Sequence, residues 1–245
     1  MYVSIDNKIH TTFNRARVFL PVIHCQDEVQ VASCIEVARA CGADGAWLIN
    51  QGGMEPAEIA QIAVDNTRND PDFWLGVNLL GTSLAGAVSA ARTLPGLWRD
   101  DAGITITRAG IVGATEDLIL RALRLRTAWK GLLFGGVAFK YQPRTVPPAF
   151  YGAVASAAAD AGIDVVTTSG PATGHPPDVA KIIAMREAIG DRALAIASGI
   201  SEDNVERFLP YTDGFIVSSS IESTPGIFDP SRVTRLAKKI HAFQP

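Results

Sequence analysis

The chain alternates short apolar runs with helical segments from Arg17 to its end, and this alternation limits the fold more than any other feature. Repeated strand–helix units form a parallel α/β sheet, because a parallel strand needs a crossover connection. Eight runs are assigned as strands: Val18–His24, Ala46–Gln51, Trp74–Leu80, a weak fourth at Ile104–Thr107 or Leu97–Arg99, Leu132–Lys140, Val165–Ser169, Leu194–Ser198 and Phe215–Ser219. Eight units favour closure, so we predict a single (β/α)8 TIM barrel over residues 17–245, with residues 1–16 as an N-terminal extension or a cover for the barrel bottom.

Length and composition agree with one large core. The chain has 245 residues, of which 47% are hydrophobic and 19% charged. Barrels of this kind typically have about 250 residues. The net charge of −3 is spread without charge blocks, so we expect no binding to nucleic acid.

The cysteines and the apolar runs predict the cellular location of the protein. Cys25, Cys34 and Cys41 are odd in number, which argues against a disulfide framework, and we expect a reducing, cytoplasmic location. The residues after Met1 lack the apolar core of a signal peptide, and no apolar run reaches about 18 residues. We therefore expect neither export nor a membrane span.

The predicted helices carry start and stop signals. The segment Asp27–Cys41 has apolar residues at helical spacing and is followed by Gly42. An acidic start also opens Leu118–Trp129, and Asp229 with Pro230 forms the N-cap and first position of the last helix.

The carboxyl ends of the predicted strands carry many polar residues. In a (β/α)8 barrel these ends open onto one mouth, where barrel enzymes do their chemistry. The residues expected there are His24, Asn50, Gln51, Asn78, Lys140, Gln142, Thr168, Ser169, Ser198, Gly199 and Ser218–Ser220. For each, the alternative is that it only satisfies backbone groups at a strand end.

The ends of the last two strands predict an anion site. Gly199 lets the backbone approach a ligand, and a helix is expected to start at Ser201, where free N–H groups and the helix dipole attract an anion. The neighbouring strand adds further donors. The predicted phosphate-binding residues are Ser198, Gly199, Ile200, Ser218, Ser219 and Ser220. The alternative is that Gly199 only permits a tight turn.

The loop Thr168–Asp178 contains two glycines and three prolines, which leave it few conformations. It is suited to presenting Thr173 and His175 accurately. His175 is a candidate acid–base group, although a lone loop histidine is more often only hydrogen-bonded or exposed. Ligand contacts are also expected from Ser169, Gly170 and Gly174.

Lys140 and a pair of aspartates are the first candidates for catalysis. Lys140 could bind a substrate oxyanion or, if desolvated, act as a base or Schiff-base nucleophile; the alternative is a structural ion pair. Asp100 and Asp101 are candidates for a general base or for binding ribose hydroxyls. Because adjacent strand residues point to opposite sides, at most one of them faces the site if the segment is extended.

The same alternation separates His24 from Cys25. The two residues cannot form a nucleophile–base pair on one strand, so Cys25 is assigned to the core or to the surroundings of the site, and His24 remains a proton-transfer candidate. Asn50 and Asn78 are expected to orient substrate hydroxyls or carbonyls. Three tryptophans could stack on a ring, although each is more often core: Trp47, Trp74 and Trp98.

Motifs for metals and nucleotide cofactors are missing from the sequence. It contains no His-Glu-x-x-His, paired-cysteine zinc spacing, Walker loop or Gly-x-Gly-x-x-Gly. We therefore assign neither a metal site nor a cofactor. Flavin stays an open alternative, because barrels can bind it through the same phosphate site.

Three stretches of the last third resemble the BtpA family, also called SgcQ-like proteins. They are Val165–Asp178, Ala197–Ser201 with Asn204-Val205, and Asp213–Ser220. Weaker matches are Ile23-His24, Gly76–Asn78 and Lys140. The resemblance implies a (β/α)8 barrel related to the ribulose-phosphate-binding group. The family usually has a proline-rich loop after the histidine of its first strand, whereas this chain has Cys25-Gln26-Asp27; a second departure is Phe139–Gln142. Different substrate-side loops are therefore expected.

Together these features predict an enzyme for a phosphorylated sugar or a phosphoribosyl, nucleotide-like compound. The expected chemistry is proton transfer, isomerisation, or cleavage of a C–N, C–C or glycosidic bond, as in isomerases and lyases. The alternative, suggested by the photosystem I biogenesis factor that gave the family its name, is a non-catalytic assembly or regulatory protein. Barrels often self-associate, but no sequence feature specifies an interface, so a homo-oligomer stays open.

Overall fold

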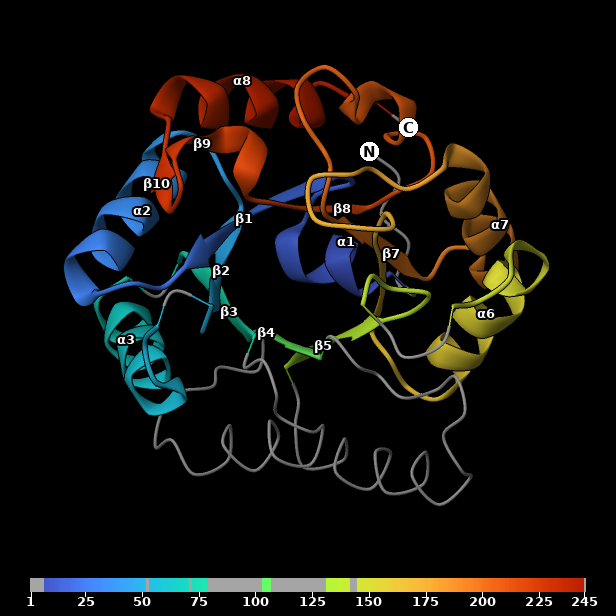
Figure 1. Cartoon of the computed structure of the whole chain (residues 1–245), viewed down its shortest axis with the longest axis horizontal. Coiled ribbons are helices and arrows are strands. Elements are labelled where there is room, and N and C mark those ends of the chain that lie inside the picture. The colour runs from blue at the N-terminus through green and yellow to red at the C-terminus, as the bar shows by residue number, and fades with distance from the viewer. Residues whose placement is uncertain are drawn as a thin grey trace.

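Eight parallel strands pair in chain order and close into a barrel (Figure 1). The computed structural model describes residues 7–51, 53–70, 72–78, 103–106, 131–141 and 145–244. The strands are β1 Val18–His24, β2 Gly45–Ile49, β3 Trp74–Asn78, β4 Gly103–Ile106, β5 Leu132–Gly136, β6 Val165–Thr168, β7 Ala193–Ala197 and β8 Gly214–Val217. The predicted (β/α)8 fold is confirmed.

The strands end earlier at their carboxyl ends than the sequence predicts. The clearest case is β5, which stops at Gly136 rather than at Lys140. Ala138 and Tyr141 have φ angles of 45° and 61°, a left-handed conformation that no strand residue adopts. Of the two candidates for the fourth strand, residues 103–106 form β4, and Leu97–Arg99 lies outside the described residues.

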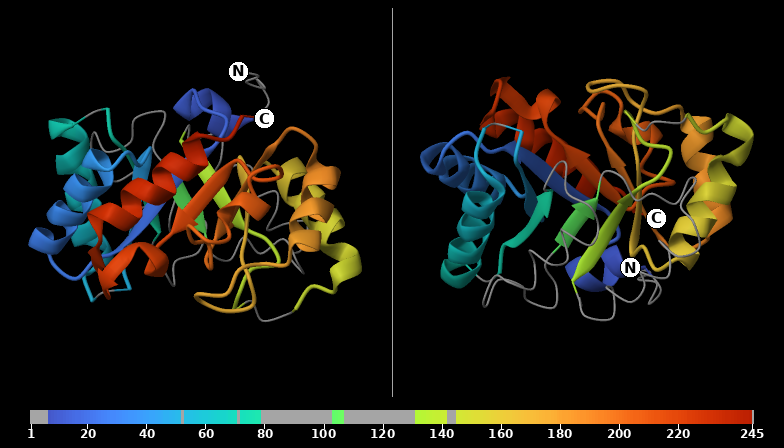
Figure 2. Two further views of the ribbon diagram at one scale, coloured as in Figure 1. Left: turned by 90° about the horizontal axis from the view of Figure 1, so that it is seen from above. Right: turned by 60° about the horizontal axis from the view of Figure 1, so that its bottom comes forward.

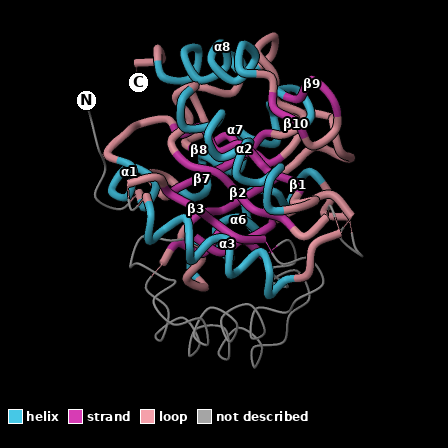
Figure 3. Tube along the Cα trace, turned by 90° about the vertical axis from the view of Figure 1, so that its left-hand side faces the viewer, coloured by secondary structure: helices cyan, strands magenta, loops and turns pink. Residues whose placement is uncertain are grey.

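The described helices surround the barrel on its outer face, except for the first, which lies at the amino end of the barrel (Figures 1 and 3). Their bounds are α1 Lys8–Phe13, α2 Glu28–Ala40, α3 Pro56–Asn69, α6 Tyr151–Asp160, α7 Val179–Ile189 and α8 Pro230–His241. Asp27 and Asp229 cap α2 and α8 through their side chains, so both predicted starts are confirmed. The predicted helix Leu118–Trp129 lies outside the described residues. In the described part of the chain, no helix is both long and apolar enough to cross a membrane.

Shorter elements complete the connections between strands and helices. They are the 3₁₀ helices η1 Pro148–Phe150, η2 Val205–Arg207 and η3 Ser219–Ile221, and a hairpin of β9 Glu222–Thr224 and β10 Ile227–Phe228. The prediction that a helix starts at Ser201 is therefore wrong, because only the short 3₁₀ helix η2 forms in this segment. The Asn204 side chain accepts from the N–H of Ser201 (2.9 Å) and donates to the carbonyl of Gly199 (2.8 Å), so local side-chain bonds replace a helical first turn.

Alternate strand residues build two apolar layers. Val18, Leu20, Trp47, Trp74 and similar residues fill the barrel interior, whereas the opposite faces of the strands pack against the helices. Trp47 meets Trp74 edge to face, with ring centroids 5.1 Å apart, and so serves as core. The same alternation directs the last residues of β1 and β3 inward.

Helix α1 closes the amino end of the barrel. Ile9 belongs to the interior cluster, and the Phe13 ring lies 5.3 Å from that of Trp74. The Asn7 side chain donates to the carbonyl of Asp191 (3.0 Å), just before β7. Figure 2 shows α1 at one end of the barrel and the loop that follows β6 at the other. The amino end is thus plugged, and the carboxyl end is the end at which (β/α)8 barrels carry their sites.

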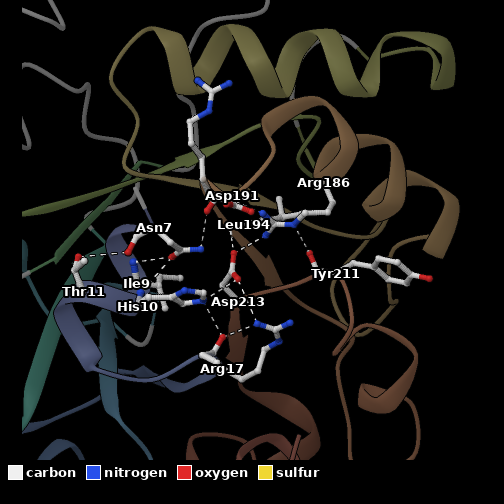
Figure 4. Close-up of polar contacts among 12 residues, drawn as sticks. Asn7, Ile9, His10, Thr11, Arg17, Arg186, Asp191, Leu194, Tyr211 and Asp213 are labelled. Carbon is white, nitrogen blue, oxygen red and sulfur yellow. Dashed lines mark hydrogen bonds and ion pairs between the residues drawn. The ribbon is translucent and has the colours of Figure 1, made fainter. Parts of the chain in front are cut away.

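A buried charge network joins α1 to the strands at this amino end (Figure 4). Asp213 is only 4% exposed. Its carboxylate accepts hydrogen bonds from the N–H of Leu194 (2.9 Å), from His10 Nε2 (3.2 Å), and from Arg17 and Arg186. Burial raises the pKa of Asp213, but the His10 hydrogen bond, the two guanidiniums and the Leu194 amide outweigh it and lower the pKa. The carboxylate is therefore charged, and it holds five segments together at the barrel bottom.

Candidate functional site

The loop of residues 169–178, here the β6 loop, folds over the ends of β6 and β7. A Cβ on Gly199 would collide with the backbone of His175 and Pro176, and a Cβ on Gly170 with the carbonyls of the same two residues. The Ser198 hydroxyl accepts from the N–H of Gly174 (3.2 Å) and donates to the carbonyl of Ala172 (3.3 Å). The close approach predicted at Gly199 is therefore used by this loop.

Two neighbouring loops offer free backbone donors. The Ser220 hydroxyl donates to the Ile200 carbonyl (2.7 Å) and so joins the loop after β7 to the loop after β8. The backbone N–H groups of Gly199 and Ile200, and of Ser219 and Ser220, have no acceptor among the residues the structure describes. We call these four amides the amide corner. Unpaired donors gathered at one place are suited to an anion.

The serine hydroxyls near the amide corner are mostly engaged with protein. Ser198 and Ser220 bond to carbonyls as described above, and Ser218 donates to Glu222 Oε1 (2.7 Å). Ser219 is exposed, and within the described chain its hydroxyl is unpaired. The sequence predicts hydroxyl and N–H donors at Ser218–Ser220; among the described residues, the donors that stay free near this corner are backbone amides and the Ser219 hydroxyl.

His24 and Glu222 face each other across the ends of β1 and β8. His24 Nδ1 lies 3.8 Å from Glu222 Oε1, and Glu222 is mostly buried. Glu222 begins the β9–β10 hairpin, which Gln30 on α2 holds through a 2.6 Å hydrogen bond to the Gly226 carbonyl. The sequence interpretation missed Glu222, because no motif marks a carboxylate in a hairpin between the last strand and the last helix.

The imidazole of His24 is held in its neutral form. Burial lowers the pKa of His24, Glu222 acts to raise it, and Lys140 lowers it further, so that the net shift is downward. A neutral imidazole at neutral pH can accept a proton. The arrangement is therefore suited to a general base, with Glu222 placed to stabilise the imidazolium that proton transfer would produce.

Lys140 lies in the loop after β5, half-buried at the mouth. Its N–H donates to the Ser169 hydroxyl (2.8 Å), and Nζ donates to the Thr173 hydroxyl (3.2 Å). Burial lowers the pKa of Lys140. No carboxylate of the described chain pairs with it, so the ion-pair alternative finds no partner there.

A second lysine, Lys181, was not predicted. It lies on α7, is 8% exposed, and its ammonium donates to the carbonyls of Ala138 (2.6 Å) and Ser169 (2.8 Å). Burial lowers the pKa of Lys181 to about 8. These two carbonyls belong to the loops that carry Lys140 and Thr173, so Lys181 positions both loops. A helix lysine at this spacing looks like an ordinary surface residue in the sequence.

The other predicted residues divide into three groups. Asn78 is buried at the end of β3, Asn50 is half-buried just after β2, and Cys25 is buried in the outer layer, opposite in direction to His24. His175 is exposed and its Nδ1 bonds only locally, to the Thr173 carbonyl at 3.1 Å. Those outside the described residues are Asp100, Asp101, Gln142 and Trp98.

The buried and the exposed residues of the β6 loop have different roles. Ser169 and Gly170 are buried, and the Ser169 hydroxyl donates to the Gly170 carbonyl (2.9 Å), so both stabilise the loop. Thr173 and Gly174 are exposed at the mouth.

Across the described ranges, no three His, Cys, Asp or Glu side chains are grouped to hold a metal ion.

Replacing Glu222 by Gln is expected to lower the pKa of His24. The substitution removes the negative charge that raises this pKa and keeps an oxygen that accepts from Ser218. Replacing Lys140 by Met removes a positive charge that lowers the pKa of His24, and is therefore expected to raise this pKa. An NMR titration of the His24 ring in the free protein measures both; shifts in the same direction for the two variants would contradict the geometry.

Known proteins with a similar sequence place the chain in a family. The model of the BtpA family matches residues 37–242. An uncharacterised protein of Thermococcus kodakarensis is 32% identical over 172 residues, which cover 67% of this chain and 63% of the relative, so the chain spans less than two thirds of that relative's length.

Two solved structures share the fold at low identity. Geranylgeranylglyceryl phosphate synthase from Thermoplasma acidophilum superposes with a TM-score of 0.66, 11% identity and coverage of 99% of this chain and 100% of that one. Phosphoribosyl anthranilate isomerase from Thermus thermophilus gives 0.61, 13%, and coverage of 93% and 100%. At such identity these two structures support the barrel alone. The family model, by contrast, spans most of the sequence: the chain belongs to the BtpA family.

Proposed function

We propose that this protein is an enzyme acting on a phosphorylated sugar or phosphoribosyl compound. The observation that carries the proposal is the amide corner: four backbone donors that have no acceptor among the described residues, on two loops joined by the bond from Ser220 to Ile200. Backbone N–H groups that no protein group uses, gathered at the ends of barrel strands, can bind a phosphate group, which offers several acceptor oxygens. The ligand's phosphate would thus lie between the ends of β7 and β8.

The barrels with the same fold support the ligand class. One is named for a phosphoribosyl substrate, and another was solved in complex with its substrate sn-glycerol-1-phosphate. This chain's own support is that its free donors lie at the ends of the last two strands, where (β/α)8 enzymes often bind phosphate.

The remaining groups of the mouth supply proton-transfer chemistry. His24, neutral through burial, would take a proton from a carbon or hydroxyl of the bound compound, and Glu222 would stabilise the resulting imidazolium. The Lys140 ammonium would stabilise negative charge that develops on a substrate oxygen. Removal of a proton beside a carbonyl is shared by isomerases and by lyases that cleave C–C or C–N bonds, so this set of groups fits either class.

A thermal-shift panel tests the proposal. Sugar phosphates and nucleoside monophosphates are each compared with their unphosphorylated forms. A ligand at 100 times its dissociation constant is expected to stabilise the fold by about 2.7 kcal/mol, or roughly 5–10 °C for a domain of this size. Only the phosphorylated members should produce the shift. If none does, the phosphate anchor is wrong, and the alternative of a scaffold for a protein partner takes its place.

Incubation of the best ligand with the protein then separates catalysis from binding. Chemical change of the ligand, followed by NMR, is expected for an enzyme. A ligand that binds tightly and stays unchanged would support the non-catalytic alternative, because a (β/α)8 fold by itself does not imply turnover.

A further inference from the structure

An unpaired acceptor lies inside the barrel at the end of β3. Asn78 is 8% exposed, and its Oδ1 atom is buried without a hydrogen-bond partner among the residues described. Buried polar atoms in native proteins nearly always have a partner, and an exception points to a missing one. The amide oxygen of Asn78 thus needs a donor that this part of the protein does not provide.

The direction of Asn78 follows from the alternation along β3. Trp74 belongs to the interior cluster, whereas Val77 lies in the outer layer, so Trp74, Gly76 and Asn78 point inward. A Cβ on Gly76 would collide with the rings of Trp47 and Trp74, which shows that the aromatic floor reaches the level of Gly76. Asn78 is the next inward residue above that floor, and it faces the mouth.

Asn78 and the amide corner stand on opposite walls of the barrel. In the closed order of eight strands, β3 is four strands away from β7 in either direction, and Figure 1 shows the two facing each other across the ring. The wall of β7 and β8 offers hydrogen-bond donors, whereas β3 offers an acceptor. Glu222 adds a carboxylate at the end of β8, beside His24.

We infer that the ligand is the phosphate monoester of a polyhydroxy chain, with a free hydroxyl that donates to Asn78 Oδ1 at the end away from the phosphate. The inference rests on the proposed function and makes it more specific. A hydroxyl at that position can donate to the amide oxygen of Asn78, whereas an alkyl group would leave this oxygen unpaired. A sugar or polyol phosphate offers both groups: phosphate oxygens that accept from the amide corner at β7 and β8, and a hydroxyl that donates to Asn78 on β3.

Calorimetric titration with three probes tests this inference: inorganic phosphate, ribitol 5-phosphate and pentyl phosphate. The last two have the same carbon chain, with and without hydroxyls. The wild-type protein is expected to bind ribitol 5-phosphate at least about tenfold more tightly than pentyl phosphate, since one hydrogen bond to a buried group is worth roughly that factor.

The variant Asn78→Leu removes the acceptor at nearly constant size. It is expected to lose about tenfold in affinity for ribitol 5-phosphate and to keep the wild-type affinities for pentyl phosphate and inorganic phosphate. Its melting temperature should be unchanged or higher, because it no longer buries an unpaired oxygen. The matched control is Asn69→Leu at the exposed end of α3. If Asn78→Leu does not fold, Asn78→Ala serves the same purpose.

The outcomes separate this inference from the proposed function. If the wild-type protein binds none of the three probes, the phosphate anchor fails and the inference fails with it. If it binds inorganic phosphate but does not prefer ribitol 5-phosphate, or if Asn78→Leu keeps that preference, the anchor stands and the role of Asn78 is overturned.

Discussion

Replacing Asp213 by Asn is expected to lower the free energy of unfolding by about 3–5 kcal/mol, the usual cost of removing one partner from a buried ion pair. The variant would leave the buried guanidinium of Arg17 and the half-buried guanidinium of Arg186 beside a neutral amide that can accept fewer hydrogen bonds. It would also weaken the bond that ties His10 on α1 to the barrel bottom. For a domain of this size we expect a melting temperature roughly 10 °C lower.

Asp160→Asn is the matched control for this variant. Asp160 forms an ion pair with Arg192, but its side chain is 66% exposed. Exposed pairs contribute about 0–1 kcal/mol, so the control should melt within a few degrees of the wild type. Equal melting temperatures for the two variants would show that the Asp213 network does not stabilise the barrel.

The pH dependence of the Asp213 variant provides a second check. The folded-state pKa of Asp213 lies below the ordinary value of 3.8. The stability that its charge contributes is therefore fully present above pH 3.8 and is lost as the pH falls through the folded-state pKa. The difference in unfolding free energy between wild type and Asp213→Asn should shrink in that acid range and stay constant above it.

The barrel could be predicted because its strands are encoded by local apolar runs. Runs such as Val165–Ser169 and Leu194–Ser198 correspond to β6 and β7 within one residue at each end. The carboxyl ends were less predictable, because apolar residues continue beyond β5 into a loop that turns through left-handed backbone at Ala138 and Tyr141. Backbone strain of that kind has no periodic signature in the sequence.

The site was predictable only where strand alternation sets a direction. His24 and Asn78 point inward because they end β1 and β3, and both were assigned to the mouth. Glu222, Lys181 and Asp213 were missed, because each acts through contacts between segments far apart in the chain. Such contacts follow from closure of the barrel and leave no local pattern.

Replacing Ser219 by Asp is expected to weaken the binding of inorganic phosphate and of sugar phosphates by about 100-fold or more. The new carboxylate would lie beside the amide corner, where it would repel the ligand and compete for the free N–H groups. Two unit charges about 4 Å apart interact by about 4 kcal/mol at an effective dielectric constant of 20. A 100-fold loss corresponds to about 2.8 kcal/mol, which allows for partial solvent screening.

Two control variants separate the effect of charge from other causes. Ser219→Asn has similar size without charge and should bind phosphate within a few-fold of the wild type. Ser33→Asp adds the same charge on the exposed face of α2 and should change neither affinity nor stability. Because Ser219 is exposed, Ser219→Asp itself should melt close to the wild type.

Calorimetric titration of phosphate into the four proteins therefore distinguishes the alternatives for the mouth. If only Ser219→Asp loses affinity, the anion lies at the ends of β7 and β8, and the four amides of the corner are its donors. If Ser219→Asp binds phosphate as tightly as the wild type, the anion lies elsewhere. The free amides would then be open to solvent only, and Lys140, whose ammonium has no carboxylate partner in the described chain, would become the first candidate for the anchor.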